Sequence, residues 1–164
     1  MKTIKKLFAL LLVCTTILTL TGCGENKNVE GTLEEIMKSI NTHAYEGVAD
    51  DQKPMLGDIN VSTDMADNIE YYIGTDEIEY EEILASEPMM SSIAYSVVLV
   101  RMKDGADIEK AKTEIKENID PRKWMCVEVP KEDIIVKNKG DLIILIMVED
   151  ETLRTKIEKG FDNL

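Results

Sequence analysis

The sequence predicts an α+β fold in which three to four helices pack on an antiparallel sheet of four to five strands. Amphipathic segments, with an apolar residue at every third or fourth position, alternate with short apolar runs. Two of those runs, 134–137 and 142–148, are separated only by a turn at Asn138-Lys139-Gly140. A connection that short joins antiparallel strands, because parallel strands need a long crossover. One domain covering residues 32–164 is expected.

Each predicted helix carries a start or stop signal. Thr32 with Glu35 three residues later forms a capping box, in which each side chain bonds the backbone N–H of the other residue. Asp107 and Asp150 are N-cap candidates, and Gly74 ends a shorter helix. The predicted helices span 33–48, 64–73, 107–119 and 151–162.

The predicted strands differ in how completely they are apolar. Segments 92–103 and 142–148 are apolar at positions facing both ways, so they are expected at the centre of the sheet with both faces covered. Segment 50–57, which contains Pro54, is expected to be a loop. The predicted strands span 80–87, 92–103, 124–129, 134–137 and 142–148.

Residues 1–22 have the pattern of a cleaved signal peptide. Three lysines precede an apolar run from 7 to 20, and that run is shorter than the roughly 20 residues that span a bilayer. The run ends in Leu20-Thr21-Gly22-Cys23, the pattern of a lipobox. Cleavage between Gly22 and Cys23 would leave the Cys23 sulfur to carry a diacylglycerol. The alternative is an uncleaved N-terminal anchor with an unmodified Cys23.

A lipidated Cys23 implies a location on the outer face of the plasma membrane, although a periplasmic location in a Gram-negative cell stays open. Residues 23–31 then form a polar tether between the lipid and the domain. Two acyl chains hold a protein on a bilayer much longer than one chain does. The membrane is therefore the first partner that the sequence predicts.

The charge of the chain excludes nucleic acid as a partner. The full sequence has a net charge of −13, with 19 basic and 32 acidic residues. Because three lysines precede Cys23 and all the acidic residues follow it, the mature chain has a net charge of about −16. Affinity for nucleic acid comes from lysine and arginine on phosphates. Anionic headgroups also repel such a surface, so the lipid must hold the domain at the membrane.

The cysteine and histidine content favours a protein without a metal or another cofactor. Cys14 would leave with the signal peptide and Cys23 would carry lipid, so Cys126 would be the one remaining thiol and could form no intramolecular disulfide. It lies in a predicted strand and is expected to be buried and inert. His43 is the single histidine, and a zinc site needs three or four His or Cys ligands.

The acidic run from Asp76 to Glu82 places five carboxylates in seven residues. It lacks the alternating ligands and the glycine of a calcium loop, and it leads directly into a strand. A solvated acidic loop is the favoured interpretation, and a weak site for a divalent cation is the alternative.

Two adjacent cations and the single tryptophan stand together at Arg122, Lys123 and Trp124. The favoured interpretation places Trp124 in the core and pairs the two cations with nearby acids. The functional alternative is a recognition patch for an anionic ligand, a carbohydrate or a protein. Met89 and Met90 are expected to fill the core, although methionine also forms adaptable contact surfaces.

Five short strings stand out as a set: Ser86-Glu87-Pro88-Met89-Met90, Ser96-Val97-Val98-Leu99-Val100-Arg101, Asp104-Gly105-Ala106-Asp107, Asp120-Pro121-Arg122-Lys123-Trp124 and Gly140-Asp141-Leu142. Together they resemble a family of short Gram-positive lipoproteins that carry a domain of unknown function. The resemblance covers roughly 80–148 and the lipobox. It implies an extracytoplasmic lipoprotein domain and no particular activity.

The sequence therefore favours a lipid-anchored extracytoplasmic protein that is not an enzyme and that acts as a binding or accessory module. This hypothesis rests on the sequence after the lipobox, which contains no catalytic motif. A small carboxylate-based hydrolase or an enzyme inhibitor at the cell envelope is the alternative. A solute-binding lipoprotein is less favoured, because binding by closure of two lobes needs a longer chain.

Overall fold

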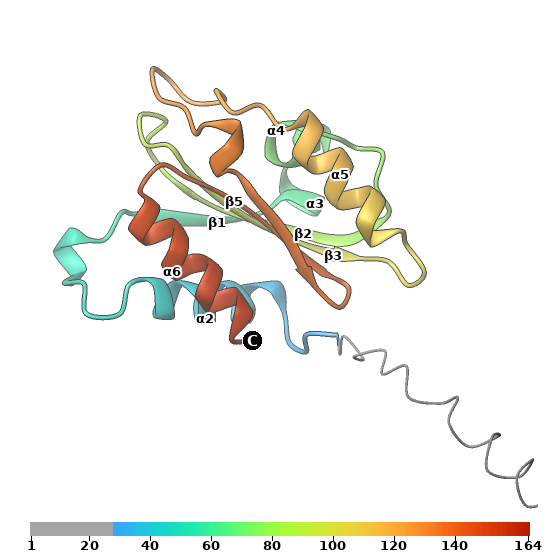
Figure 1. Ribbon diagram of the computed structural model, residues 1–164, viewed down its shortest axis with the longest axis horizontal. Coiled ribbons are helices and arrows are strands. Elements are labelled where there is room, and N and C mark those ends of the chain that lie inside the picture. The colour runs from blue at the N-terminus through green and yellow to red at the C-terminus, as the bar shows by residue number, and fades with distance from the viewer. Residues whose placement is uncertain (1–27) are drawn as a thin grey trace, which may run out of the picture.

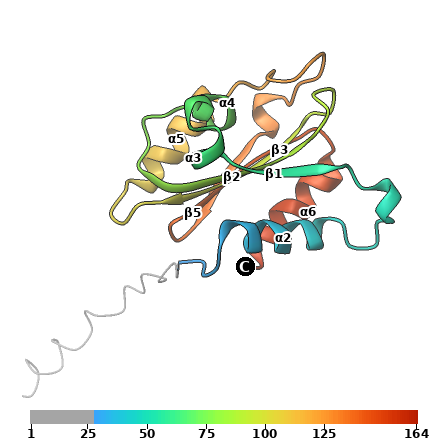
Figure 2. The same ribbon diagram turned by 180° about the vertical axis from the view of Figure 1, so that it is seen from behind.

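Residues 28–164 are described by the structure, a computed structural model, and they form a five-stranded antiparallel sheet with helices on both faces (Figures 1 and 2). The predicted signal peptide, the cleavage position after Gly22 and the lipid attachment residue Cys23 lie outside the described residues. The predicted α+β class with an antiparallel sheet is confirmed.

The elements follow one another with short connections. The helices are α2 (Leu33–Ala44), α3 (Val61–Asp64), α4 (Ile69–Ile73), α5 (Ile108–Asn118) and α6 (Glu151–Asp162). Three 3-10 turns are η1 (Asp50–Gln52), η2 (Ala66–Asn68) and η3 (Lys131–Asp133). The strands are β1 (Leu56–Asn60), β2 (Tyr80–Pro88), β3 (Tyr95–Met102), β4 (Ile135–Lys139) and β5 (Leu142–Val148).

The strand order β1-β2-β3-β5-β4 puts the two most apolar strands at the centre. In the register, Val98 of β3 lies opposite Ala85 of β2 on one side and Leu145 of β5 on the other. All seven residues of β5 are buried. The prediction that both apolar segments are covered on both faces is confirmed, because each face buries one set of alternating side chains.

Two separate hydrophobic cores result from this alternation. Helices α2 and α6 cover the face that carries Leu84, Val97 and Ile144. Helices α3, α4 and α5 cover the face that carries Ala85 and Val98, on the opposite side of the sheet in both ribbon views (Figures 1 and 2). The sheet is therefore the middle of three layers.

The predicted helix caps are present. Thr32 Oγ1 accepts a hydrogen bond from the backbone N–H of Glu35, and a Glu35 carboxylate oxygen accepts one from the N–H of Thr32. Asp107 and Asp150 cap α5 and α6 by accepting from backbone N–H groups. The left-handed conformation of Gly74 ends α4.

Three local predictions were wrong. The expected loop at 50–57 contains η1 and the start of β1, an edge strand whose pairing is supplied by β2. The expected helix over 64–73 is broken into short turns, so the described residues hold five α-helices, where three to four were expected. The expected strand 124–129 is irregular, because Met125 N–H bonds Ser91 and Cys126 has a φ of 64°.

Arg101 fastens the beginning of the described chain to the sheet. Its guanidinium donates to the carbonyl oxygens of Val29 (2.7 Å) and Gly31 (3.0 Å), and it pairs with Asp141 (3.3 Å). The last residues of the predicted tether therefore lie against the domain. Within the described part of the chain, no helix has the length and apolar character needed to cross a bilayer.

Candidate functional site

A buried ion pair joins the loop after α5 to the centre of the sheet. Lys123 Nζ lies 2.7 Å from Glu87 Oε1 of β2 and 3.0 Å from Ser96 Oγ of β3, and Ser96 Oγ donates to the same Glu87 oxygen at 2.7 Å. The Lys123 side chain is 2% exposed and that of Glu87 is 11% exposed. The three polar groups therefore satisfy one another away from water, as buried polar groups must.

Aromatic rings surround the ammonium group of Lys123. The Nζ atom lies 4.6 Å from the ring centre of Tyr71 and 5.5 Å from those of Tyr72 and Trp124. Tyr71 and Tyr72 belong to α4 and pack edge to face at 5.0 Å. Because the faces of aromatic rings attract cations, the rings replace part of the hydration that Lys123 loses on burial.

The electrostatics of this cluster follow from its burial. Burial lowers the pKa of Lys123, while the Glu87 carboxylate acts in the opposite direction by Coulomb attraction and a hydrogen bond. Burial also raises the pKa of Tyr71 and of Tyr72, and the charge of Glu87 adds to both shifts. Each charge of the pair is therefore stabilised mainly by the other, because burial removes the water that would otherwise solvate them.

The contact between Ser96 and Lys123 has the residue types of a serine nucleophile and its lysine base. A hydrolase of this kind needs a substrate carbonyl to reach the serine oxygen. Ser96 is 0% exposed and lies on the central strand β3. In this conformation the contact therefore joins the loop after α5 to β3.

The three residues of the predicted patch have different surroundings. The side chain of Arg122 is 75% exposed and pairs with Glu128. Lys123 is buried in the ion pair, and Trp124 is 7% exposed within the core between the sheet and α4. Trp124 Nε1 has no hydrogen-bond acceptor among residues 28–164. The geometry brings Lys123 and Trp124 together beneath the surface and leaves Arg122 on it.

Four exposed methionines lie on three neighbouring segments of the chain. Met55, Met89, Met90 and Met125 are 75%, 78%, 62% and 67% exposed, so the expectation that Met89 and Met90 fill the core was wrong. Backbone hydrogen bonds join their three segments: Met89 N–H to Met55 O at 3.3 Å, and Met125 N–H to Ser91 O at 2.9 Å. These four residues are called the methionine end below.

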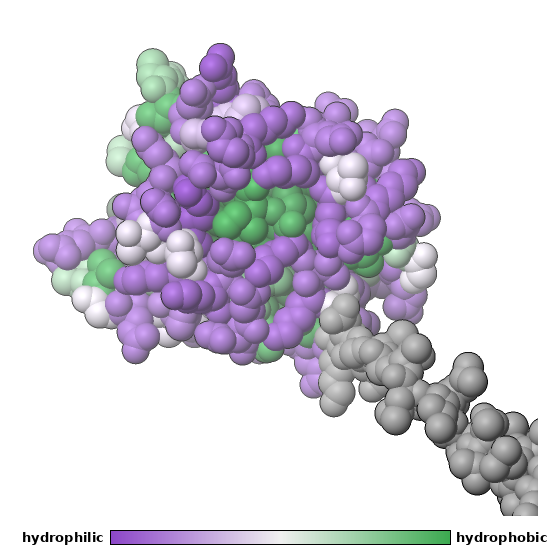
Figure 3. Space-filling view, in the orientation of Figure 1, coloured by the Kyte–Doolittle hydropathy of each residue, from purple (hydrophilic) through white to green (hydrophobic). Residues whose placement is uncertain are grey.

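The methionine end occupies one corner of the molecule. In Figure 1 the β2–β3 loop and the loop after α5 meet at the upper left, and Figure 3 shows hydrophobic residues collected there. Pro88 alone separates Met89 and Met90 from Glu87, and Met125 follows the pair of Lys123 and Trp124. The buried ion pair therefore holds the loops that carry the exposed methionines.

Cys126 lies beside the methionine end and is exposed, so the prediction of a buried thiol on a strand was wrong. Its backbone adopts a φ of 64°, which turns the chain out of an extended conformation.

The acidic run from Asp76 to Glu82 is largely exposed, and Glu82 accepts a hydrogen bond from Asn60 at 3.3 Å. Residues 28–164 contain no group of three or more His, Cys, Asp or Glu side chains placed to hold a metal ion.

Sequence reasoning missed the partners of Lys123. Glu87 and Ser96 lie 36 and 27 residues before it, and no short-range pattern links them. A polar residue in a strand that is otherwise apolar, as Ser96 is in β3, was the available signal.

Comparisons of this chain with family models, with curated proteins and with solved structures find no match.

Proposed function

We propose that this protein is a lipid-anchored extracytoplasmic binding module that engages a partner protein through its methionine end. The exposure of four methionines on three interlocked loops carries the proposal. Large exposed apolar side chains that gather at one place mark interaction surfaces. Methionine suits this role because its flexible and polarisable side chain adapts to the shape of a partner.

The buried ion pair supports this function by preorganising the loops. Lys123 is anchored by Glu87 and Ser96, and the backbone N–H of Met125 bonds Ser91. Two of the three methionine-bearing loops are therefore tied to the sheet and to each other. A surface that is rigid before binding loses less conformational entropy when the partner arrives. The methionine end is therefore preorganised for binding.

The position of the methionine end fits a membrane-anchored domain. Arg101 holds Val29 and Gly31 at the end of the domain where the described chain begins. Both ribbon views place that beginning at the corner opposite the β2–β3 loop (Figures 1 and 2). A lipid on Cys23 would therefore leave the methionine end directed away from the bilayer, where a partner reaches it.

Changing Met89 and Met90 to glutamine is expected to lower partner recovery from solubilised membranes at least about tenfold, a loss of about 1.4 kcal/mol. Glutamine keeps the length of methionine but removes its apolar surface. The unfolding free energy should change by less than about 0.5 kcal/mol, because both side chains are exposed. Met65→Gln is the matched control, since Met65 is also exposed but lies outside the methionine end. Equal recovery by both variants would contradict the proposal.

The anchor is tested by the intact mass of the protein isolated from membranes of its native host. The expected mass is that of a chain beginning at Cys23 with a diacylglycerol on its sulfur, and Cys23→Ala should release the protein from the membrane fraction. A chain that retains residues 1–22, or an unmodified Cys23, would remove the anchor from the proposal.

A further inference from the structure

The edge strand β4 lies at the floor of an open hollow. Within the described sheet it pairs with β5 alone and ends the strand order. A hollow of about 440 Å³ lies between it and α5, lined by Ile134, Ile135 and Val136 and by four residues of α5. Figure 3 shows this apolar floor as the central green area, framed by hydrophilic residues.

The hairpin geometry determines which backbone groups of β4 face outward. Lys139 and Leu142 flank a turn of two residues, Gly140 and Asp141, with Gly140 at a φ of 59°. The flanking pair of such a turn is hydrogen-bonded, and hydrogen-bonded pairs alternate along an antiparallel ladder. The N–H and C=O groups of Val136 and Asn138 therefore point away from β5.

The carbonyl of Ile134, two residues before Val136, confirms this alternation. It faces outward and accepts a hydrogen bond from Lys116 of α5. A row of outward backbone groups is a template for another strand. The edge of β4 therefore offers the hydrogen bonds that an added strand needs.

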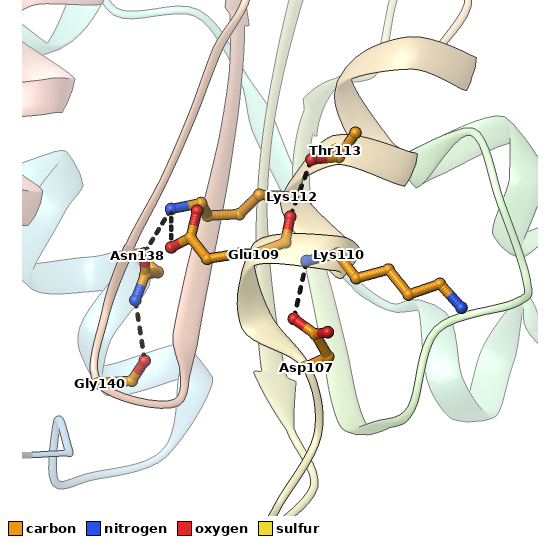
Figure 4. Close-up of polar contacts among 7 residues, drawn as sticks. All are labelled: Asp107, Glu109, Lys110, Lys112, Thr113, Asn138 and Gly140. Carbon is orange, nitrogen blue, oxygen red and sulfur yellow. Dashed lines mark hydrogen bonds and ion pairs between the residues drawn. The ribbon is translucent and has the colours of Figure 1, made fainter.

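A second side chain of α5 fixes the rim of the hollow. Lys112 Nζ lies 2.6 Å from Glu109 Oε1 and 2.9 Å from Asn138 Oδ1, and the Asn138 amide donates to the Gly140 carbonyl at 3.1 Å (Figure 4). Helix α5 is thereby held beside β4 at the hairpin end. These contacts of Lys112 fix the distance between the helix and the edge of β4, and so they keep the hollow open.

Lys116 and Lys131 lie at the other end of the hollow, where Glu117, Glu132 and Asp133 are also close by. Among residues 28–164, Lys116 Nζ bonds only the carbonyl oxygens of Lys131 and Ile134, and Lys131 Nζ bonds the carbonyl oxygen of Glu117 at 2.9 Å. Burial lowers the pKa of Lys116 and the charge of Lys131 lowers it further, while Asp133 and Glu132 oppose both. A carboxylate placed here would pair with a cation whose bonds in the described chain go to neutral carbonyl groups.

We propose that β4 receives an extended acidic peptide segment of a partner protein, which adds a sixth strand to the sheet. Its backbone would pair with Val136 and Asn138, its apolar side chains would cover the partly exposed Val136, and a carboxylate would contact Lys116. A second copy of this chain would occupy the edge by dimerisation, which the test below detects. This inference does not depend on the methionine end, which other residues form.

The test uses an eight-residue peptide of alternating valine and glutamate with blocked ends, added to residues 28–164, which fold as one body with a continuous core on each face of the sheet. Hydrogen exchange followed by NMR is expected to show at least about tenfold slower exchange at the Val136 and Asn138 amides. A peptide of alternating valine and lysine should give no protection. Absence of protection with the glutamate peptide, or protection confined to residues 89–91 and 125, would overturn the proposal.

Two variants separate the backbone contribution from the charge contribution. Val136→Pro removes an outward N–H that β5 does not use, and Val136→Thr keeps that N–H with a similar shape. Proline should abolish the protection of Asn138 and threonine should keep it. Lys116→Gln leaves the backbone intact and should weaken peptide binding several-fold, which tests the charge even if the proline variant unfolds. Dimerisation of the free domain through β4 would also overturn the proposal.

Discussion

Replacing Lys123 by alanine is expected to destabilise the domain by about 3–5 kcal/mol, the range measured when one partner of a buried ion pair is removed. The Glu87 side chain is only 11% exposed in the structure, and the change leaves its carboxylate without a cation. It also removes the ammonium group that lies over the rings of Tyr71, Tyr72 and Trp124. Urea denaturation of the purified domain measures the loss directly.

Arg122→Ala is the matched control for Lys123→Ala. The two cations are adjacent, but Arg122 is 75% exposed in its pair with Glu128, and exposed pairs contribute up to about 1 kcal/mol. Removing both buried charges, with Lys123→Met and Glu87→Leu together, should recover much of the stability lost in the single variant. A Lys123→Ala effect as small as that of Arg122→Ala would contradict a buried ion pair.

The buried pair of Lys123 and Glu87 also predicts how the stability of the domain depends on pH. The pKa of Lys123 is lowered in the folded state, so between that pKa and the ordinary lysine value the unfolded chain binds more protons than the folded one. The stability contributed by this group therefore rises with pH through that window and is lowest at pH values below the folded pKa. The difference in unfolding free energy between wild type and Lys123→Met should follow this course in urea titrations.

Gly74→Ala is expected to destabilise the domain by at least about 3 kcal/mol. Gly74 has a φ of +81°, a conformation that costs an alanine roughly 1–2 kcal/mol. A Cβ there would also lie 2.3 Å from the backbone nitrogen of Ile119 and 2.6 Å from the Asn118 carbonyl carbon. Backbone atoms cannot move aside cheaply, so the end of α4 would separate from the end of α5.

Gly105→Ala isolates the conformational part of this cost. Gly105 has a φ of +80°, and no atom lies within 4 Å of the position that an alanine methyl group would take, so only the backbone strain remains. The two variants should differ by about 2 kcal/mol in urea denaturation. Equal effects would show that α4 and residues 118–119 are not in tight contact. Because α4 carries Tyr71 and Tyr72, Gly74→Ala should also loosen the aromatic layer around Lys123.

The accuracy of the sequence-based predictions depended on how local each signal was. Caps such as Thr32 with Glu35, and Asp107, depend on residues three positions apart, and they were predicted correctly. The strand β1 was missed because Gly57 and Asp58 disfavour a strand, and pairing with β2 supplies what the local sequence lacks.

The candidate site was predicted only in part for the same reason. Lys123 and Trp124 stood out by composition, but their contacts with Glu87 and Ser96 depend on the sheet topology. Met89 is 78% exposed because it lies in the loop between β2 and β3, whereas methionine is usually a core residue. Tertiary packing, rather than residue type, decided which of these side chains reached the surface.

The most direct test of the binding function is site-specific photo-crosslinking on intact membranes, with a photoreactive residue at position 90 in one strain and at position 65 in another. Both positions carry exposed methionines, but only Met90 belongs to the methionine end. The predicted result is one discrete adduct of constant mass from position 90, lost when Met89 is changed to glutamine, and none from position 65. Adducts from position 65 alone, or equal adducts from both positions, would contradict binding through the methionine end.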